Sequence, residues 1–194
     1  VYYRMALDAG IEMMPSELRT YDGVTHFLTQ RFDREGNEKI HTQTLAAMLP
    51  TSDSYEDIFS VIRRLNLPYE DSRQHFLRMV FNVTTRNVDD HSKNFSFCMN
   101  KKGIWRLSPA YDLTYSVDLT APAYSNRHSL TINGKNEDIT REDLGTVGQN
   151  NDIQDYNALI DTVYNAVAKF ESHARELRID EKLIKSIQED FIKV

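Results

Sequence analysis

Residues 86–97, RNVDDHSKNFSF, decide how this chain is interpreted, because charged side chains stand there directly before a short apolar segment. The charged part contains Arg86, Asp89, Asp90, His91 and Lys93, and it follows a stretch with helical periodicity. An ordinary surface loop does not need such an ordered set of charges, whereas a site that handles phosphate and a metal ion does. The segment is therefore expected to be a functional loop between a helix and a strand.

The spacing around this loop follows a recognisable order. Asp89 and Asn94 form the arrangement Asp-x-x-x-x-Asn, and Asp112 follows in the stretch SPAYDLTYS. Between them lie the apolar segments FSFCM and IWRL, joined by residues 100–103, a pattern typical of a β-hairpin. A protein-kinase-like lobe presents its catalytic parts in this same order: a helix, an Asp-x-x-x-x-Asn loop, a hairpin and an aspartate.

The chemistry of phosphoryl transfer explains these residue types. One carboxylate accepts or orients the proton of the acceptor hydroxyl, and the spacing favours Asp89 as this base. Asn94 and Asp112 are predicted to hold Mg²⁺, which prefers hard oxygen ligands, and Lys93 is predicted to stabilise charge on the transferred group. Asp90 is the competing candidate for the base. It stands one residue too close to Asn94 and is interpreted as a loop-capping or solvated residue.

The run NVDDHSKNFSF…WRLSPAYDLTYS resembles the HipA family, the serine/threonine kinase toxins of bacterial toxin–antitoxin operons. Upstream, FLTQRFDREG is similar to the RFDR hinge segment of that family, and MALDAGIEM and KIHTQTLAAML are also similar to it. The resemblance extends from the N-terminus to about residue 180. It identifies the chain as a HipA-like C-terminal domain.

The resemblance implies roles for the residues of the loop. Asp89 matches the proton acceptor of the family, and Asn94 and Asp112 match its metal-holding pair. His91 and Lys93 fall in the loop that contacts the nucleotide. Two simpler alternatives stay open: His91 as an ordinary loop histidine and Lys93 as a solvated lysine.

Further nucleotide contacts are implied outside the loop. Tyr111 precedes the metal aspartate as it does in relatives. Gln30, Arg31 and Phe32 match the hinge, whose backbone groups would pair with adenine. Gln30 stands where relatives often carry Glu, so the expected contact there is made by the backbone. The resemblance thus implies ATP and Mg²⁺ as cofactors.

The resemblance also implies partners and an activity. Kinases of this type phosphorylate components of translation, aminoacyl-tRNA synthetases among them, and are restrained by a helix-turn-helix, HipB-like antitoxin that binds operator DNA. None of the seven glycines forms a G-x-G-x-x-G loop, and no strand before the hinge carries an ATP-anchoring lysine. Residues 1–194 are therefore expected to be one catalytic-lobe domain that lacks the N-terminal ATP-loop portion and is inactive or weakly active alone. The alternative is a binding module that docks an antitoxin or a separate N-terminal subunit.

Composition agrees with a cytoplasmic protein that binds neither membrane nor, by itself, nucleic acid. The chain has 40% hydrophobic and 27% charged residues, a formal net charge of -6 and a pI near 5.5. Cys98 is the single cysteine, so no disulfide can form within the chain, and a reducing compartment is expected. No apolar run approaches the roughly 20 residues that cross a bilayer. Because the chain begins with Val1, it is expected to be a fragment, a processed product or an engineered piece.

Periodicity predicts a mainly α-helical fold with a small β-hairpin, the C-terminal lobe of a HipA-type, protein-kinase-like structure. Helices are expected within residues 2–13, 54–65, 70–85, 153–174 and 180–192, and the helix that begins near residue 140 is expected to carry a capping box of Thr140 and Asp143. A strand is expected around residues 24–28, and another at residues 129–132.

Overall fold

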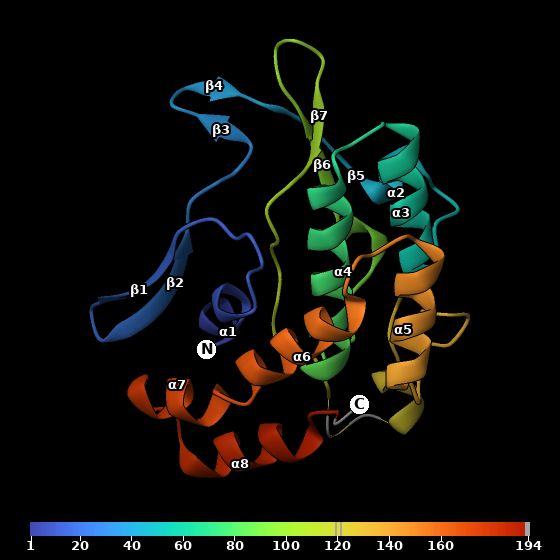
Figure 1. Cartoon of the computed structure of the whole chain (residues 1–194). Helices are drawn as coiled ribbons and strands as arrows, with labels where there is room; N and C mark the ends of the chain where they lie inside the picture. Colours follow the sequence, from blue (N-terminus) through green and yellow to red (C-terminus); the bar gives the residue numbers. More distant parts are fainter. Residues whose placement is uncertain (119, 121, 193–194) are drawn as a thin grey trace.

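The computed structural model describes residues 1–118, 120 and 122–192, the backbone alone at 123 and 124. Helix α4 (Tyr69–Thr84) forms its centre and is buried on nearly every side. Helix α3 (Tyr55–Arg64) and helix α6 (Tyr156–Val167) pack against it, and α6 in turn contacts α1 (Tyr2–Asp8) and α5 (Arg141–Asn150) (Figure 1). This arrangement buries the C-terminal end of α4 and part of the loop that follows it, including Asn87, Val88 and Asp90.

Local sequence signals determine where these helices begin. Ser54 and Asp57 form a capping box at α3, and Thr140 and Asp143 form the predicted one at α5. Pro68 precedes the first residue of α4 and fixes its start. The capping side chains satisfy N–H groups of the first helical turn without tertiary contacts, and the predicted capping box of Thr140 and Asp143 is confirmed.

The predicted hairpin is present as β6 (Ser96–Met99) and β7 (Trp105–Leu107). It is not the only β-structure, however. Strand β5 (His41–Thr44) pairs with β6, so the hairpin belongs to a three-stranded sheet. Sequence patterns missed this pairing because β5 and β6 are brought together by α3 and α4, which lie between them in the chain.

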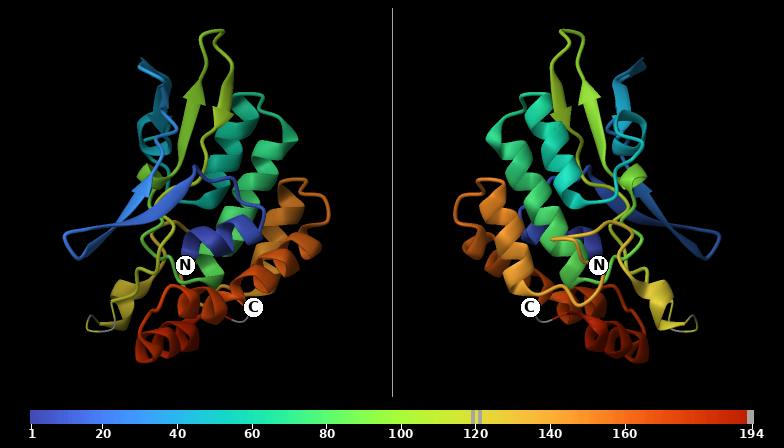
Figure 2. Two further views of the ribbon diagram at one scale, coloured as in Figure 1. Left: turned by 90° about the vertical axis from the view of Figure 1, so that its left-hand side faces the viewer. Right: turned by 90° about the vertical axis from the view of Figure 1, so that its right-hand side faces the viewer.

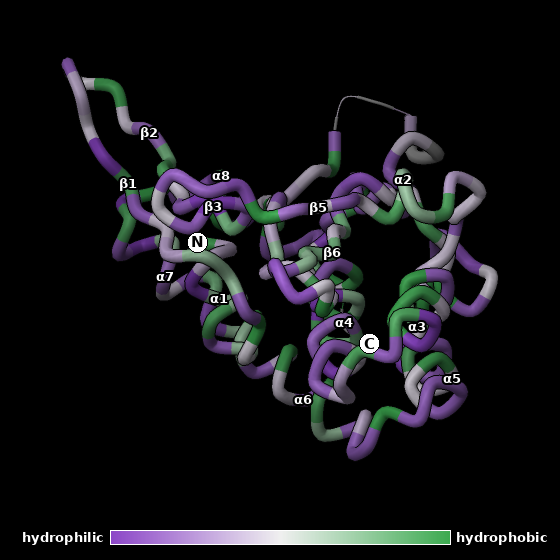
Figure 3. The backbone as a smooth tube through the Cα atoms, turned by 90° about the horizontal axis from the view of Figure 1, so that it is seen from above, coloured by the Kyte–Doolittle hydropathy of each residue, from purple (hydrophilic) through white to green (hydrophobic). Residues whose placement is uncertain are grey.

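Two further hairpins lie beside the helical body. Strand β1 (Ser16–Tyr21) pairs with β2 (Val24–Thr29), and β3 (Arg34–Glu35) pairs with β4 (Glu38–Lys39). Figure 2 shows β1–β2 projecting from the body in both side views, and in Figure 3 it again extends away from the helices. The strand around residues 24–28 is therefore confirmed. Strand β1 was not predicted, because SELRTY lacks the apolar alternation of a half-buried strand.

Two predicted elements differ in the structure. The long helix expected over residues 153–174 is divided into α6 and α7 (Phe170–Glu176), and the bend lets Phe170 pack edge-on against Phe191 with ring centroids 4.9 Å apart. Residues 129–132 form only isolated β-bridges, Ser54 with Thr131 and Ile132 with Lys135, and no strand. Burial of Phe170 overrides the helical pattern of residues 153–174. Packing of residues 129–132 on α3 overrides their strand pattern.

Short elements complete the chain: α2 (Leu45–Met48), the 3₁₀ turns η1 (Ser92–Asn94) and η2 (Ala123–Asn126), and α8 (Glu181–Asp190). Asp180 caps α8 as predicted, because its side chain accepts the N–H groups of Lys182 and Leu183. In the part of the chain that the structure describes, no helix combines the length and the apolarity that crossing a membrane requires.

Candidate functional site

The loop after α4 is anchored by Asp90, a fully buried carboxylate. It accepts hydrogen bonds from the Tyr55 hydroxyl, from His128 Nδ1 and from the backbone N–H of Ser129, each 2.7 Å long. The interpretation of Asp90 as a solvated residue is wrong. The interpretation as a loop-capping residue describes only part of its role, because Asp90 also binds side chains from other segments. Because its partners come from α3 and from residues 128–129, Asp90 ties the loop to two distant segments.

Asp89, the predicted base, has the opposite environment. Its side chain is 66% exposed, and Nε2 of His91 lies 3.9 Å from Asp89 Oδ1. The backbone beneath it is fixed, because the N–H groups of Val88 and Asp89 donate to Ser116 Oγ at 2.7 and 3.0 Å. A rigid backbone thus presents a free carboxylate at the surface, as a proton acceptor requires.

Asn94 and Asp112 line one small cavity of about 10 Å³. The amide nitrogen of Asn94 donates to the Asp89 carbonyl at 2.9 Å, which leaves the amide oxygen of Asn94 for a ligand. Asp112 adopts a left-handed backbone conformation (φ 57°), and Asn87 holds its carbonyl at 3.2 Å. Among the described residues, no hydrogen bond or ion pair engages the Asp112 carboxylate.

The two oxygens suit Mg²⁺, which binds proteins through one or two carboxylates and completes its shell with water and phosphate oxygens. They do not suit a cage made wholly of protein, and the described residues hold no group of three or more His, Cys, Asp or Glu side chains that could bind a metal. The donor set therefore fits an ion brought in with a phosphate ligand. Asp89 does not line this cavity.

The predicted hinge lines a second cavity, of about 230 Å³, that includes Gln30, Arg31, Phe32 and Tyr111. The rings of Phe32 and Tyr111 stack with centroids 5.3 Å apart. The N–H of Gln30 donates to the Pro15 carbonyl at 3.0 Å and is therefore not free to pair with a base. The Gln30 N–H therefore cannot make the adenine contact expected of the hinge, and that contact is left to the other backbone groups of residues 30–32.

The Arg31 side chain binds Asp33, two residues further along the chain. Its guanidinium makes two hydrogen bonds with Asp33, of 2.7 and 2.6 Å, and this pairing holds the pKa of the Asp33 carboxyl at about 2. The Arg31 charge is thus already compensated.

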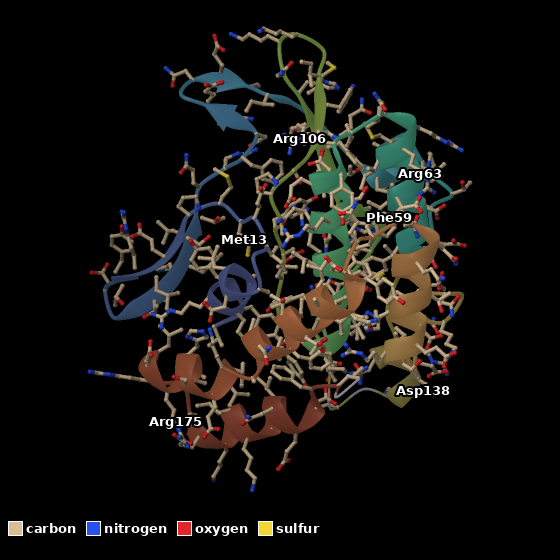
Figure 4. All side chains as sticks on the ribbon, in the orientation of Figure 1. Met13, Phe59, Arg63, Arg106, Asp138 and Arg175 are labelled. Carbon is tan, nitrogen blue, oxygen red and sulfur yellow. The ribbon has the colours of Figure 1, made fainter. Side chains whose placement is uncertain are left out.

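Tyr111 connects these parts of the site. Its hydroxyl is within 2.6 Å of Ser96 Oγ and donates to the Lys93 carbonyl at 2.7 Å, and burial raises its pKa. Tyr111 lines the hinge cavity, the small cavity and a third of about 650 Å³, which also includes Met13 (labelled in Figure 4) and Phe27. Tyr111 therefore borders three neighbouring cavities, one at the hinge and two at Asp112.

The other two predicted residues of the loop, His91 and Lys93, lie nearer the surface. Lys93 is exposed and contributes its backbone carbonyl to the Tyr111 contact, and His91 is half-exposed beside Asp89. Neither side chain lines the three cavities around Tyr111. A larger cavity of about 700 Å³ lies between β4 and the β6–β7 turn, and it contains none of the predicted site residues.

Sequence reasoning missed several residues that shape the site: Arg78, Asn82, Asn87, Ser116 and His128. Asn87 donates to Asn82 Oδ1 at 3.1 Å, and Ser116 Oγ donates to Asn87 Oδ1 at 3.3 Å, so Asn82, Asn87 and Ser116 form one hydrogen-bonded network. The signal that could have found two of them is polar residues four apart, Arg78 and Asn82, in the otherwise apolar segment 76–83. The others approach only in the folded chain.

Comparison with known proteins identifies the family of the chain. A family model described as the HipA-like C-terminal domain matches residues 1–192. The chain belongs to this family. A protein of Sinorhizobium fredii named "Putative kinase Y4mE" is 28% identical to it over 130 residues, which cover 59% of this chain and 31% of that protein.

The fold is shared with a solved HipA structure. In the complex of HipA, HipB and operator DNA from Shewanella oneidensis MR-1, the similar chain superimposes with a TM-score of 0.73 at 17% identity. The match covers 96% of this chain and 51% of that one. The HipA-like domain described here thus spans about half the length of the solved relative and about a third of the curated one.

Proposed function

We propose that this HipA-like domain is the catalytic lobe of a serine/threonine protein kinase that uses Mg²⁺ and ATP. The observation that carries the proposal is that Tyr111 lines both the hinge cavity and the small cavity of Asn94 and Asp112. These segments are far apart in the sequence, and their proximity supports a site with a base-binding end beside oxygen ligands, as phosphoryl transfer needs. The name of the Sinorhizobium relative supports the same class of activity.

Each residue has a role in this proposal. Asp89 accepts the proton of the serine or threonine hydroxyl, because its carboxylate is exposed and carried on a fixed backbone. Asn94 and Asp112 would hold Mg²⁺, which when bound neutralises charge on the phosphates. Phe32 and Tyr111 offer stacked aromatic rings beside the hinge cavity, a suitable wall for a planar base.

The experiment compares two carboxamide variants of this chain. Calorimetry measures binding of Mg²⁺–ATP, and radiolabelled γ-phosphate reports transfer to proteins of a bacterial lysate. The transfer assay includes any segment that the gene encodes upstream of Val1. Asp112→Asn should remove both nucleotide binding and transfer. Asp89→Asn should remove transfer and leave binding within about twofold, because the base acts only on the acceptor hydroxyl. Undiminished transfer by Asp89→Asn would refute the assignment.

The second candidate function, a binding module, is favoured by the β1–β2 hairpin. Leu18 and Phe27 face each other across the two strands and are 51% and 60% exposed. Among the described strands, β1 and β2 pair only with each other. Such an apolar, open-edged ribbon suits docking of an N-terminal subunit or of a helix-turn-helix antitoxin. A chain that binds such a partner but shows no Asp112-dependent binding of Mg²⁺–ATP would favour this alternative.

The proposal also covers the antitoxin that would restrain the kinase and the proteins that it would phosphorylate. The solved relative is in complex with HipB and operator DNA, and we infer a HipB-like antitoxin as a partner here. Components of translation such as aminoacyl-tRNA synthetases are the proposed substrates. Phosphoproteomics of cells that express the wild type or Asp89→Asn would identify them.

A further inference from the structure

One face of α4 carries a buried polar stripe made of Asp71, Gln74, Arg78 and Asn82. The members are three or four residues apart, so they align along one side of the helix. All are at most 3% exposed. Polar groups at this depth are normally hydrogen-bonded, because an unsatisfied one is costly.

Three members of this stripe have protein partners. Asp71 binds the guanidinium of Arg106, labelled in Figure 4, at 2.9–3.0 Å. The Gln74 side chain accepts the N–H of Glu12 and donates to the Gly10 carbonyl. Asn82 donates to the Tyr55 hydroxyl at 2.9 Å. These contacts account for three of the four polar positions.

Arg78 is the exception. Its Nε is buried without a hydrogen-bond partner, and within the described part of the chain no hydrogen bond or ion pair engages its guanidinium, although the carboxylates of Glu12 and Asp71 act on the charge at longer range. Burial lowers the Arg78 pKa to about 10, so the group stays charged at neutral pH. A buried charge without a partner is strongly unfavourable for folding, and such a cost is typical of functional sites.

The position of Arg78 indicates what the charge is for. Arg78 lines the same small cavity as Asn94, Asp112 and Tyr111. The volume of about 10 Å³ is enough for about one water molecule and too small for a phosphate group. A single water in this cavity would lie among the guanidinium and the two predicted metal ligands, since all three line it.

We propose that Arg78 is a positioning residue, which orients the Asn94–Asp112 pair through a buried water and favours the anionic Mg²⁺–nucleotide complex by its charge. The inference rests on the proposed function, because it assigns the pair to that complex. Residues that orient metal ligands typically contribute about 10–100-fold to affinity. A charge held in a region of low dielectric also acts on an anion with little screening.

The test uses two variants of the 194-residue chain. Arg78→Met keeps an unbranched apolar stem but removes the charge and the donors, whereas Arg78→Lys keeps a charge and a donor. Arg78→Met should weaken binding of Mg²⁺–ATP by about 10–100-fold while its Tm stays the same or rises. Arg78→Lys should lose distinctly less affinity, because an ammonium can still donate to the bridging water. A merely structural arginine would instead lower Tm when it is replaced.

The outcomes separate the two proposals. Wild-type binding of Mg²⁺–ATP that Asp112→Asn abolishes supports the proposed function, and its absence overturns both proposals. If the wild type binds and Arg78→Met binds equally well, the inference about Arg78 alone fails. A clear fall in Tm for Arg78→Met also overturns it, because the guanidinium would then have a stabilising partner.

Discussion

The buried carboxylate of Asp90 allows a sharp prediction, because its neighbour Asp89 provides a matched control. Replacement of Asp90 by Asn keeps the volume and removes the charge. Asn can still accept the N–H of Ser129 at Oδ1, but its amide nitrogen would then face two groups that donate to Oδ2, the Tyr55 hydroxyl and His128 Nδ1. The substitution thus turns two hydrogen bonds into contacts between donors.

The magnitude follows from these contacts. A hydrogen bond to a charged group contributes about 1.5–3 kcal/mol, and two are lost in Asp90→Asn. His128 can recover one, because its other tautomer accepts at Nδ1. With one bond lost, we therefore expect the free energy of unfolding to fall by about 1.5–3 kcal/mol. Asp89→Asn should change it by less than about 0.5 kcal/mol, because that side chain is 66% exposed.

Urea unfolding at pH 7, followed by far-UV circular dichroism, measures both values. The midpoint should move in Asp90→Asn while the slope stays constant, since the surface exposed on unfolding is unchanged. Equal stability of the Asp90→Asn variant and the wild type would refute the anchoring role. So would a larger loss in Asp89→Asn than in Asp90→Asn.

Two further predictions concern the packing around α4. His75 is fully buried, its Nε2 lies 3.0 Å from the Tyr55 carbonyl, and burial lowers its pKa to about 3 from 6.5. Because the unfolded chain binds more protons between these values, stability should fall as the pH drops through this window, by about 2 kcal/mol between pH 7 and pH 5. Gly148→Ala would place a Cβ 2.8 Å from Tyr156 Cβ and 3.1 Å from Phe76 Cε2, and should cost about 1–3 kcal/mol despite the better helix propensity of Ala.

Each of these predictions has its own control. His75→Gln removes the titrating group, so its stability should depend less steeply on pH over that range; an unchanged dependence would contradict the assignment. Gly145→Ala meets only the far edge of the Tyr156 ring, at 3.2 Å, and should lose less stability than Gly148→Ala. A Tm of Gly148→Ala equal to that of the wild type would contradict the close packing.

Much of the fold could be predicted from local chemistry. The capping boxes at Ser54 and Thr140, the boundary at Pro68 and the β6–β7 hairpin all arise from interactions between residues close in the chain. The division of residues 153–174 at Lys169 could not be predicted, because it depends on where Phe170 finds Phe191. Strand β5 could not be predicted either, since it forms only where β6 is presented to it.

The site shows the same division. The spacing of Asp89, Asn94 and Asp112 and the family resemblance of the surrounding motifs came from the sequence itself, and the family is confirmed over residues 1–192. The roles of these residues stay predictions. Their environments were not readable from spacing: two adjacent aspartates are chemically alike in sequence, yet one is exposed and the other is fully buried.

The sequence by itself determined which chemical groups are present, where the helices begin, and at what spacing the candidate site residues follow one another. Only the tertiary structure decided that Asp90 is an anchor, that Tyr111 joins the hinge to Asp112, and that Arg78 lies buried without a partner. The physical reason is that caps and periodicity act over a few residues. Desolvation and hydrogen bonding of a buried charge depend on segments such as 54–55, 86–94 and 128–129, which meet only after the chain has folded.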